Sequence, residues 1–432
     1  MPSATRLDQA CGILHALLAG LERLVADGTP EAAVRCGWRP VPALDWERRL
    51  AAAALETACR DVQARWGLLR LRDPRTGGLS LEGGCGFGRE TFDRLRERPF
   101  DFELEAFDSR LPLWRSESDP ATLDLILREA FPETRALVSV PLINGADAGQ
   151  GVIALGFDQA AGALWSKRVR ALTEPAGKLA AILHAHRRLQ GACEDAAARR
   201  PQAPQPCPCL CSRNGHGVPS AVSLAYSDAQ IGQACCGYCA EAVSAAGDRR
   251  LFTATLGIDE FDGAWEALAL EAAFDVACLL GVTPGDLPDV FDRAWGEAGG
   301  SSGLRPDFRF ACADVAESGK EYVFAGALSH LLYESRLQMA TELSSRPAER
   351  EGPVACEERR IRMGSGDILI LHAWNLPDDL TTRHQIHRQL QAALARDGRR
   401  PIEVVAARVN AVLGQWSLCP AGSPALLVLR SE

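Results

Sequence analysis

A short segment rich in proline, alanine and charge divides this chain into two parts. Residues 194–206 read EDAAARRPQAPQP, a composition typical of a linker because it offers almost no apolar side chains for a core. The chain has 432 residues, so each part is long enough to bury a core of its own. We therefore predict an N-terminal helical segment, a first domain, a linker and a second domain, at residues 1–44, 45–190, 191–206 and 207–432.

Composition and charge exclude several classes of protein. Apolar residues make up 47% of the chain and charged residues 24%, as in ordinary globular proteins. The net charge of -9 argues against a nucleic-acid binder that works by neutralising phosphates. The first ten residues do not read as a signal peptide, and the sequence suggests no membrane span. With 15 cysteines and no secretion signal, we expect reduced thiols and a cytoplasmic location.

The first domain has a recognisable order of elements. Apolar periodicity predicts helices at residues 7–24, 50–62 and 166–190, and strands at 66–72, 79–82, 136–142 and 149–158. This order resembles a GAF domain, most clearly from Arg135 to Gln190. The resemblance implies an α/β/α sensor with a pocket for an unknown small molecule under residues 83–128, or else a structural GAF module without a ligand. Cys85 is the one cysteine in that stretch, and it reads either as an attachment point for a tetrapyrrole or as a small packed thiol.

The last helix of the first domain carries an apolar stripe. Its members lie close to one helical face: Leu172, Leu179, Ile182, Leu183 and Leu189. Part of the stripe must pack on the domain's own sheet. A surplus at its C-terminal end would pair with a second copy, so a homodimer is one expectation and a purely intradomain core is the other.

The second domain contains a short buried strand behind a turn. Residues 366–371 read GDILIL, in which Gly366 and Asp367 form the turn and four apolar residues follow. We expect further strands near 222–226, 250–257, 308–315, 321–327, 357–363 and 425–429, and helices at 265–280, 383–394 and 402–413. This order of elements resembles the SpoIIE-type branch of the PPM serine/threonine phosphatases. The resemblance implies an α-β-β-α sandwich of two antiparallel sheets. The fold class expected for the whole chain is α+β.

The resemblance also implies where a phosphatase would hold its metals. Members of the family use carboxylates to bind two Mg or Mn ions, which activate a water for attack on a phosphoester. The matched positions here are all without carboxylates: Gly237, Ala240, Ile258, Asn375 and Ser423. Three nearby aspartates could substitute as ligands: Asp259, Asp378 and Asp379. The alternative is that they are solvated turn residues without a role in metal binding. We therefore expect a pseudophosphatase with no catalytic cofactor, and Mg or Mn only if the substitutes serve as ligands.

Six cysteines crowd near the start of the second domain. They are Cys207, Cys209, Cys211, Cys235, Cys236 and Cys239. Four thiolates in a tetrahedron suit zinc, but the spacing is not that of a standard zinc ribbon. The alternatives are a redox-responsive dithiol and small apolar packing residues.

Three classes of function follow from these patterns. The first is a bacterial signalling regulator in which a GAF sensor is joined to a phosphatase-like domain that binds a partner without hydrolysing phosphate. The second is an active phosphoserine phosphatase that acts on an anti-anti-sigma protein of the STAS type. The third is a regulator that responds to zinc or to redox state through its cysteines. Family analogy implies a partner protein in a sigma-factor pathway for the first two classes.

Overall fold

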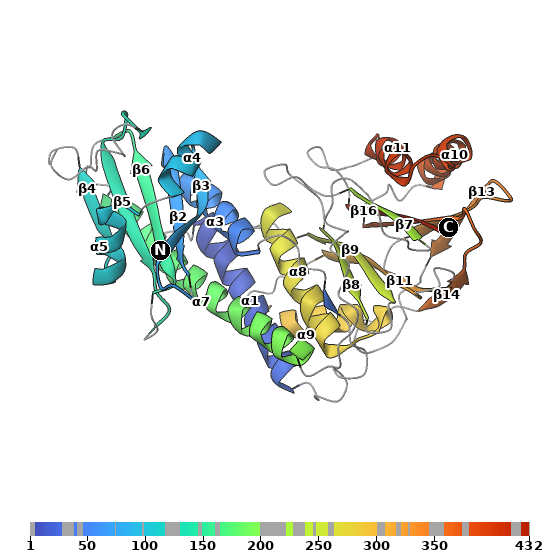
Figure 1. The fold of residues 1–432 in the computed structure, drawn as a ribbon, viewed down its shortest axis with the longest axis horizontal. Coiled ribbons are helices and arrows are strands. Elements are labelled where there is room, and N and C mark those ends of the chain that lie inside the picture. The colour runs from blue at the N-terminus through green and yellow to red at the C-terminus, as the bar shows by residue number, and fades with distance from the viewer. Residues whose placement is uncertain are drawn as a thin grey trace. The chain divides into compact units, whose positions relative to one another are not determined.

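The computed structural model describes residues 5–27, 39–40, 46–73, 75–96, 99–116, 130–145, 149–159, 165–198, 222–227, 238–244, 248–257, 263–299, 307–316, 321–326, 329–344, 358–373, 380–415 and 425–431. The chain forms two compact units. Unit 1 comprises Met1–Leu18 and Asp45–Arg188, and unit 2 comprises Ala19–Leu44 and Leu189–Glu432. Each unit combines sheet with helix, so the chain is an α+β protein, as the sequence predicts (Figure 1).

Unit 1 is built on one antiparallel sheet with the strand order β3-β2-β6-β5-β4. Its strands are β2 (Trp66–Arg72), β3 (Leu79–Cys85), β4 (Leu113–Ser116), β5 (Ala136–Leu142) and β6 (Gly151–Phe157). The hairpin between β2 and β3 forms as expected, because Asp73 accepts hydrogen bonds from the Arg75 amide and the Thr76 hydroxyl. Strands β5 and β6 are buried at every position because both faces of the sheet are covered.

Helices cover the two faces of this sheet. Helix α3 (Trp46–Val62) packs on β2 and β3, while α5 (Asp101–Ser109) packs on β5 and β6 from the opposite face (Figure 1). Helix α4 (Arg89–Arg96) lies beside β3. Side chains alternate along β2, so Gly67 faces α3 whereas Leu68 joins a core with Leu95 of α4 and Phe102 of α5. This is the α/β/α arrangement that the sequence predicts for the first domain.

Helix α7 (Trp165–Ala198) is longer than the sequence predicts, because it continues past Gln190 into the segment read as a linker. The five members of its apolar stripe are all buried, with exposed fractions of 6% or less. The stripe from Leu172 to Leu183 therefore belongs to the core of unit 1, and the homodimer stays an expectation.

Helix α1 (Arg6–Asp27) is long and apolar enough to meet the length and composition of a membrane span. Its leucines at positions 7, 14, 17, 18 and 21 are each no more than 1% exposed, as in the core helix of a globular protein. The backbone amide of Leu7 also donates to the carboxylate of Asp61 in α3, at 2.8 Å. Burial of this kind accounts for the apolar character of α1 without a membrane.

Unit 2 contains two antiparallel sheets. The first has the order β1-β8-β9-β10-β11-β14, formed by β1 (Arg39–Pro40), β8 (Tyr238–Val243), β9 (Arg249–Gly257), β10 (Asp307–Val315), β11 (Glu321–Gly326) and β14 (Arg359–Arg362). The second has the order β13-β12-β15-β16-β7, formed by β13 (Met339–Ser344), β12 (Ser329–Glu334), β15 (Ile368–Ala373), β16 (Ala425–Ser431) and β7 (Val222–Ser227). Strands β15 and β16 pair in the second sheet, with Leu369 opposite Leu429.

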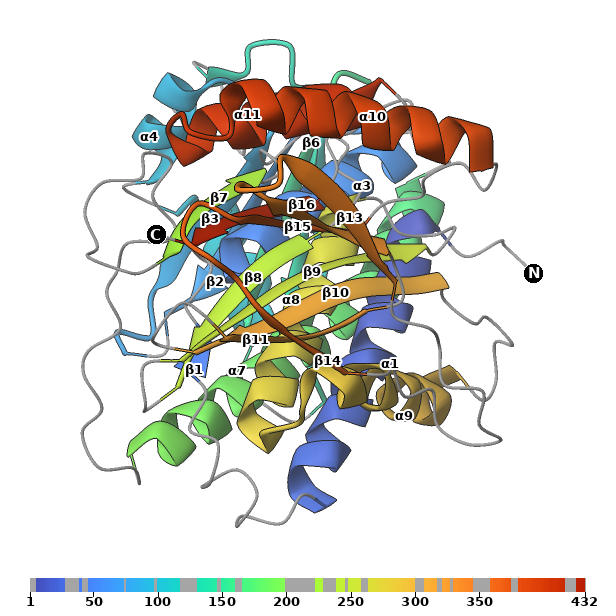
Figure 2. The same cartoon turned by 90° about the vertical axis from the view of Figure 1, so that its right-hand side faces the viewer.

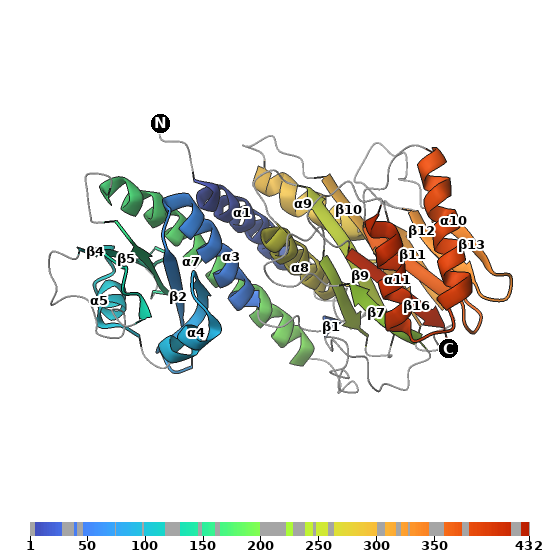
Figure 3. The same ribbon diagram turned by 90° about the horizontal axis from the view of Figure 1, so that it is seen from above.

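The two sheets stack face to face between two layers of helices (Figures 2 and 3). Helices α8 (Gly263–Leu280) and α9 (Leu287–Gly299) lie on the side of β8 and β9, and α10 (Leu380–Asp397) and α11 (Ile402–Gly414) lie on the side of β15 and β16. Alternation along β15 explains both contacts. Leu369 and Leu371 enter the core between the sheets, whereas Ile368 and Ile370 pack under α10 and α11. The α-β-β-α sandwich expected for the second domain is therefore the observed fold.

Candidate functional site

The metal-ligand positions expected from sequence lie mostly outside the described residues. Of the five matched positions only Ala240 is described, and the three substitute aspartates, Asp259, Asp378 and Asp379, are not. Ala240 is half-buried on β8 and lies opposite Phe252 of β9. A methyl group supplies no ligand for a cation, so this position cannot serve as the carboxylate that the family uses.

The described strands that precede or follow the other matched positions in the sequence pair within their sheets. Strand β8 begins at Tyr238, directly after Gly237, and β9 ends at Gly257, directly before Ile258; these two strands are neighbours in the first sheet. In the second sheet, Ala373 at the end of β15 pairs with Ala425 at the start of β16, next to the segments that hold Asn375 and Ser423. Within the described part of the chain, no group of three or more His, Cys, Asp or Glu side chains is arranged to hold a metal ion.

A buried carboxylate that the sequence reasoning missed lies close to the end of β9. Glu266, in the first turns of α8, is 9% exposed and accepts a hydrogen bond from the backbone amide of Leu256. Burial raises its pKa to about 7, and the Leu256 amide opposes that shift only in part. Such a group is close to half-protonated at neutral pH. In the sequence it is one of three acidic residues in an otherwise apolar helix, with no local sign that it would be buried.

An aromatic side chain of β11 packs between the two sheets of the sandwich. The ring of Phe324 is fully buried in this core. It lies beside Leu369 and Leu371 of the opposite sheet. The position therefore contributes to the stability of the stacked sheets.

The cysteine cluster is described at one position only. Cys239 lies on β8 opposite Thr253 of β9, and the other five predicted zinc ligands are outside the described residues: Cys207, Cys209, Cys211, Cys235 and Cys236. Zinc binding by this cluster stays a prediction.

The face of the unit 1 sheet under α4 and α5, where the sequence predicts a ligand pocket, contains a buried ion pair. Arg70 of β2 donates from Nε to Oε2 of Glu103 at 2.7 Å, and both side chains are fully buried. Arg70 also donates to the carbonyl of Leu95 at 2.7 Å, while Glu103 accepts the amide of Phe100 at 2.9 Å. Burial raises the pKa of Glu103, although Arg70 and the Phe100 amide oppose that shift.

Two buried polar atoms on this side of unit 1 have no hydrogen-bond partner among the described residues. They are Oε1 of Glu103 and Oγ of Ser139. Ser139 lies on β5 opposite Ala154 of β6, and Ala154 belongs to the core under α4 and α5. Paired residues share a face of a sheet, so Ser139 faces the same core. Since buried polar groups are normally hydrogen-bonded, these atoms mark where an additional polar group would be stabilised.

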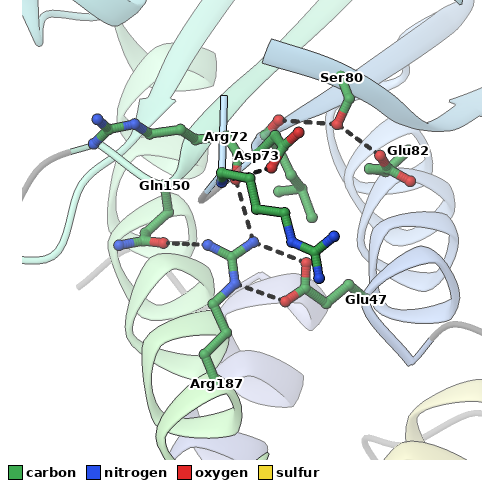
Figure 4. A network of polar contacts seen from close by, with 9 residues as sticks. Glu47, Arg72, Asp73, Ser80, Glu82, Gln150 and Arg187 are labelled. Carbon is green, nitrogen blue, oxygen red and sulfur yellow. Dashed lines mark hydrogen bonds and ion pairs between the residues drawn. The ribbon is translucent and has the colours of Figure 1, made fainter. Parts of the chain in front are cut away.

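A second polar network ties the C-terminal half of α7 to the start of α3 and to the β2–β3 hairpin (Figure 4). The guanidinium of Arg187 donates to both carboxylate oxygens of Glu47, at 2.7 and 2.8 Å, and to the side chain of Gln150 at 2.9 Å. Its contact with the carbonyl of Arg72 is longer, at 3.4 Å. The hydrogen bonds that Arg187 donates to the Glu47 carboxylate raise the pKa of the guanidinium further. A bidentate pair of this kind fixes the orientation of α7 relative to α3 within unit 1.

Comparisons with known proteins give no sequence-level match. No family description matches the chain, and no curated protein matches it. Solved structures are similar to it only in fold. One contains the RsbU and RsbW domains of a Mycobacterium tuberculosis protein, at 14% identity and a TM-score of 0.36, covering 48% of this chain and 59% of that one. The chain thus spans less than two thirds of that structure.

Two further structures each match part of the chain. A GAF domain region from a Geobacter sulfurreducens membrane protein has 17% identity and a TM-score of 0.28, covering 32% of this chain and 92% of that one. The phosphatase domain of SpoIIE from Bacillus subtilis, solved with a fragment of its regulatory domain, has 10% identity and a TM-score of 0.30, covering 50% and 59%. Both kinds of fold that the sequence resembles occur among these structures. All three TM-scores are below 0.5. The description of the fold therefore rests on the strand order and layers given above and not on these matches.

Proposed function

We propose that this chain is a signalling regulator in which unit 1 is a GAF-like sensor and unit 2 is a phosphatase-like domain that binds a partner protein without hydrolysing phosphate. The single observation that carries the proposal is that unit 2 has the phosphatase-like fold but lacks the carboxylates expected as metal ligands. The sandwich has its two sheets and four covering helices, whereas Ala240 stands within β8 at a position where the resemblance requires a carboxylate. A dinuclear cation site of this type is built on several carboxylates, and the other four matched positions also lack a carboxylate.

The proposal gives unit 1 the input role. Glu103 Oε1 and Ser139 Oγ are buried polar atoms on the face where a GAF-like domain would accept a small molecule. The partner proposed for unit 2 is a regulatory protein of the STAS type or its kinase, by analogy with the SpoIIE-type family that the sequence resembles. The proposed location is the cytoplasm, where such proteins act.

Metal content and turnover, measured on one purified sample, test the proposal. We expect no Mn- or Mg-dependent hydrolysis of an aryl phosphate or a phosphoserine peptide above that of a variant carrying Asp259→Ala, Asp378→Ala and Asp379→Ala. Calorimetry with a purified STAS-type protein should show binding without loss of its phosphate. Metal-dependent turnover that the triple substitution abolishes would instead establish an active phosphatase with relocated ligands.

A further inference from the structure

Two cysteines of unit 1 lie side by side although they come from different elements. Cys59 is in the last turn of α3, and Cys85 is the last residue of β3. Neither thiol is in a disulfide, and the two are hydrogen-bonded to each other. Both thiols lie on the face of the unit 1 sheet that α3 covers. The buried Arg70–Glu103 pair lies on the opposite face, under α4 and α5.

A glycine on the neighbouring strand makes this contact sterically possible. Gly67 of β2 lies directly opposite Cys85 in the β2–β3 ladder. A Cβ atom at Gly67 would approach the Sγ atom of Cys59 to 2.9 Å, closer than real side chains allow. The missing side chain therefore lets the Cys59 thiol lie against the sheet beside Cys85.

The two thiols differ in accessibility and in acidity. Cys85 is half-exposed, whereas Cys59 is 7% exposed. The hydrogen bond from Cys59 lowers the pKa of Cys85 to about 7, against the effect of partial burial. Of the two charges nearest to Cys85, Glu56 raises its pKa and Arg60 lowers it, and these two residues form an ion pair at 2.9 Å. The same hydrogen bond, together with burial, raises the pKa of Cys59.

We propose that Cys85 and Cys59 form an oxidation site for hydroperoxides, in which Cys85 is the reacting thiol and Cys59 resolves it to an intradomain disulfide. The thiolate is the reactive form of cysteine, and an accessible thiolate beside a second thiol is the arrangement in which sulfenic acid condenses to a disulfide. Oxidation at this site would link the end of α3 to the end of β3. It is independent of the six clustered cysteines of the second domain and of the proposed role of unit 2.

The chemistry balances with a hydroperoxide as the oxidant. The Cys85 thiolate attacks the terminal oxygen, the O–O bond breaks, and the alkoxide or hydroxide leaves and takes a proton from water. The sulfenic acid then forms on Cys85. The Cys59 sulfur attacks the Cys85 sulfur, the S–O bond breaks, and the departing hydroxide leaves as water with the Cys59 proton. Overall two thiols are oxidised by two electrons, and one hydroperoxide is reduced to an alcohol or water plus a second water.

Peptide mapping of the full-length protein tests this site. Reduced protein is treated with one equivalent of hydrogen peroxide at pH 7, free thiols are alkylated, and the chain is digested with trypsin. Cys59 and Cys85 fall in separate tryptic peptides, residues 50–60 and 76–89, each with a single cysteine. We expect these two peptides to be recovered as one disulfide-linked species. We also expect Cys85 to be alkylated at pH 7 roughly tenfold faster than an ordinary exposed thiol, because about half of it is thiolate.

Three variants separate the roles of the two thiols. Cys85→Ser should abolish the linked species and leave Cys59 reduced. Cys59→Ser should leave Cys85 as a sulfenic acid that a dimedone probe captures. Cys11→Ser, which changes a buried thiol of α1, should leave the yield of the linked species unchanged. Recovery of Cys85 and Cys59 as separate alkylated peptides after peroxide treatment would overturn the proposal, as would Cys85 linked equally to other cysteines.

Discussion

The imidazole of His186 stacks on the indole of Trp46, with ring centroids 3.7 Å apart and planes within 7° of parallel. His186 is on α7 and Trp46 is the first residue of α3, so the stack lies beside the bidentate pair between Arg187 and Glu47. Both rings are buried, and Nδ1 of His186 has no hydrogen-bond partner among the described residues. The histidine is therefore part of the packing between two helices of unit 1 and depends on being neutral.

Acidification should destabilise the protein through this histidine. Burial, helped by Arg187 and Arg49, lowers the pKa of His186 to about 3 in the folded protein. The unfolded chain binds the proton near pH 6.5, so stability falls as pH drops from there toward 3. Between pH 7 and pH 5 the loss from this one group is about 2 kcal/mol. Urea denaturation at both values should show that loss in the wild type and a smaller one in His186→Phe, which keeps a ring in the stack. Equal losses in the two proteins would contradict the assignment.

Glu266 should have the opposite pH dependence. Its pKa is raised to about 7 in the folded protein by burial, so the unfolded chain releases the proton first, near pH 4.5. The stability present below pH 4.5 is lost as pH rises through 7, by about 2 to 3 kcal/mol. Glu266→Gln keeps an oxygen to accept the Leu256 amide and cannot ionise. We expect this variant to match the wild type at pH 4.5 and to be more stable at pH 8, measured by chemical denaturation.

The buried pair in unit 1 should show strong coupling between its partners. Arg70→Met leaves the Glu103 carboxylate buried without its cation, at a cost of about 3 to 5 kcal/mol. Adding Glu103→Leu removes the orphaned charge, and most of that stability should return. A smaller residual loss, about 1 kcal/mol, is expected from the Phe100 amide, which loses its acceptor. Additive losses in the double variant, measured by urea denaturation, would show that the two residues do not stabilise each other.

The clustered cysteines give a prediction that metal analysis can check. We expect protein purified without added metal to be free of zinc, and the double substitution Cys236→Ser with Cys239→Ser to leave melting unchanged. On a strand, Cys235 and Cys236 would point to opposite faces, which does not favour a shared metal. About one zinc per chain, lost in the double variant together with stability, would show instead a closed four-ligand site.

Apolar periodicity predicted most of the regular elements because the pattern of apolar residues within each element shows which of its positions are buried. The GDILIL run is apolar at four consecutive positions, and β15 is buried on both faces. The hairpin of β12 and β13 was not predicted, because its turn has no sequence signal. Its turn contains Gln338 with a φ of 52°, a conformation that glycine or asparagine would have signalled. Helix α4 was missed because it is short and polar, with one buried residue, Leu95.

The functional residues were harder to predict because their partners are remote in sequence. Arg70 reads as an exposed position in a strand, and only the fold brings it to Glu103 on α5. Cys59 and Cys85 likewise have no C-x-x-C spacing, and their contact depends on Gly67 between them in the packed unit. The degenerate metal positions were proposed from a resemblance, which gives locations along the chain but not ligands. Among the described residues, Ala240 lies on β8, and the role that the resemblance gives its position stays a prediction.

Strand β1 determines how this protein can be divided for study. Arg39 and Pro40 pair with Val243 and Ala242, so β1 forms the edge of a sheet whose other strands come from far along the chain. A fragment that starts at residue 207 would leave the outer edge of β8 without its partner, and an unpaired edge invites association with other chains. Unit 2 is thus discontinuous in sequence, with the greater part of unit 1 inserted between its first strand and the rest. Expression of the sandwich alone would require residues 19–44 to be rejoined to it by a designed connection.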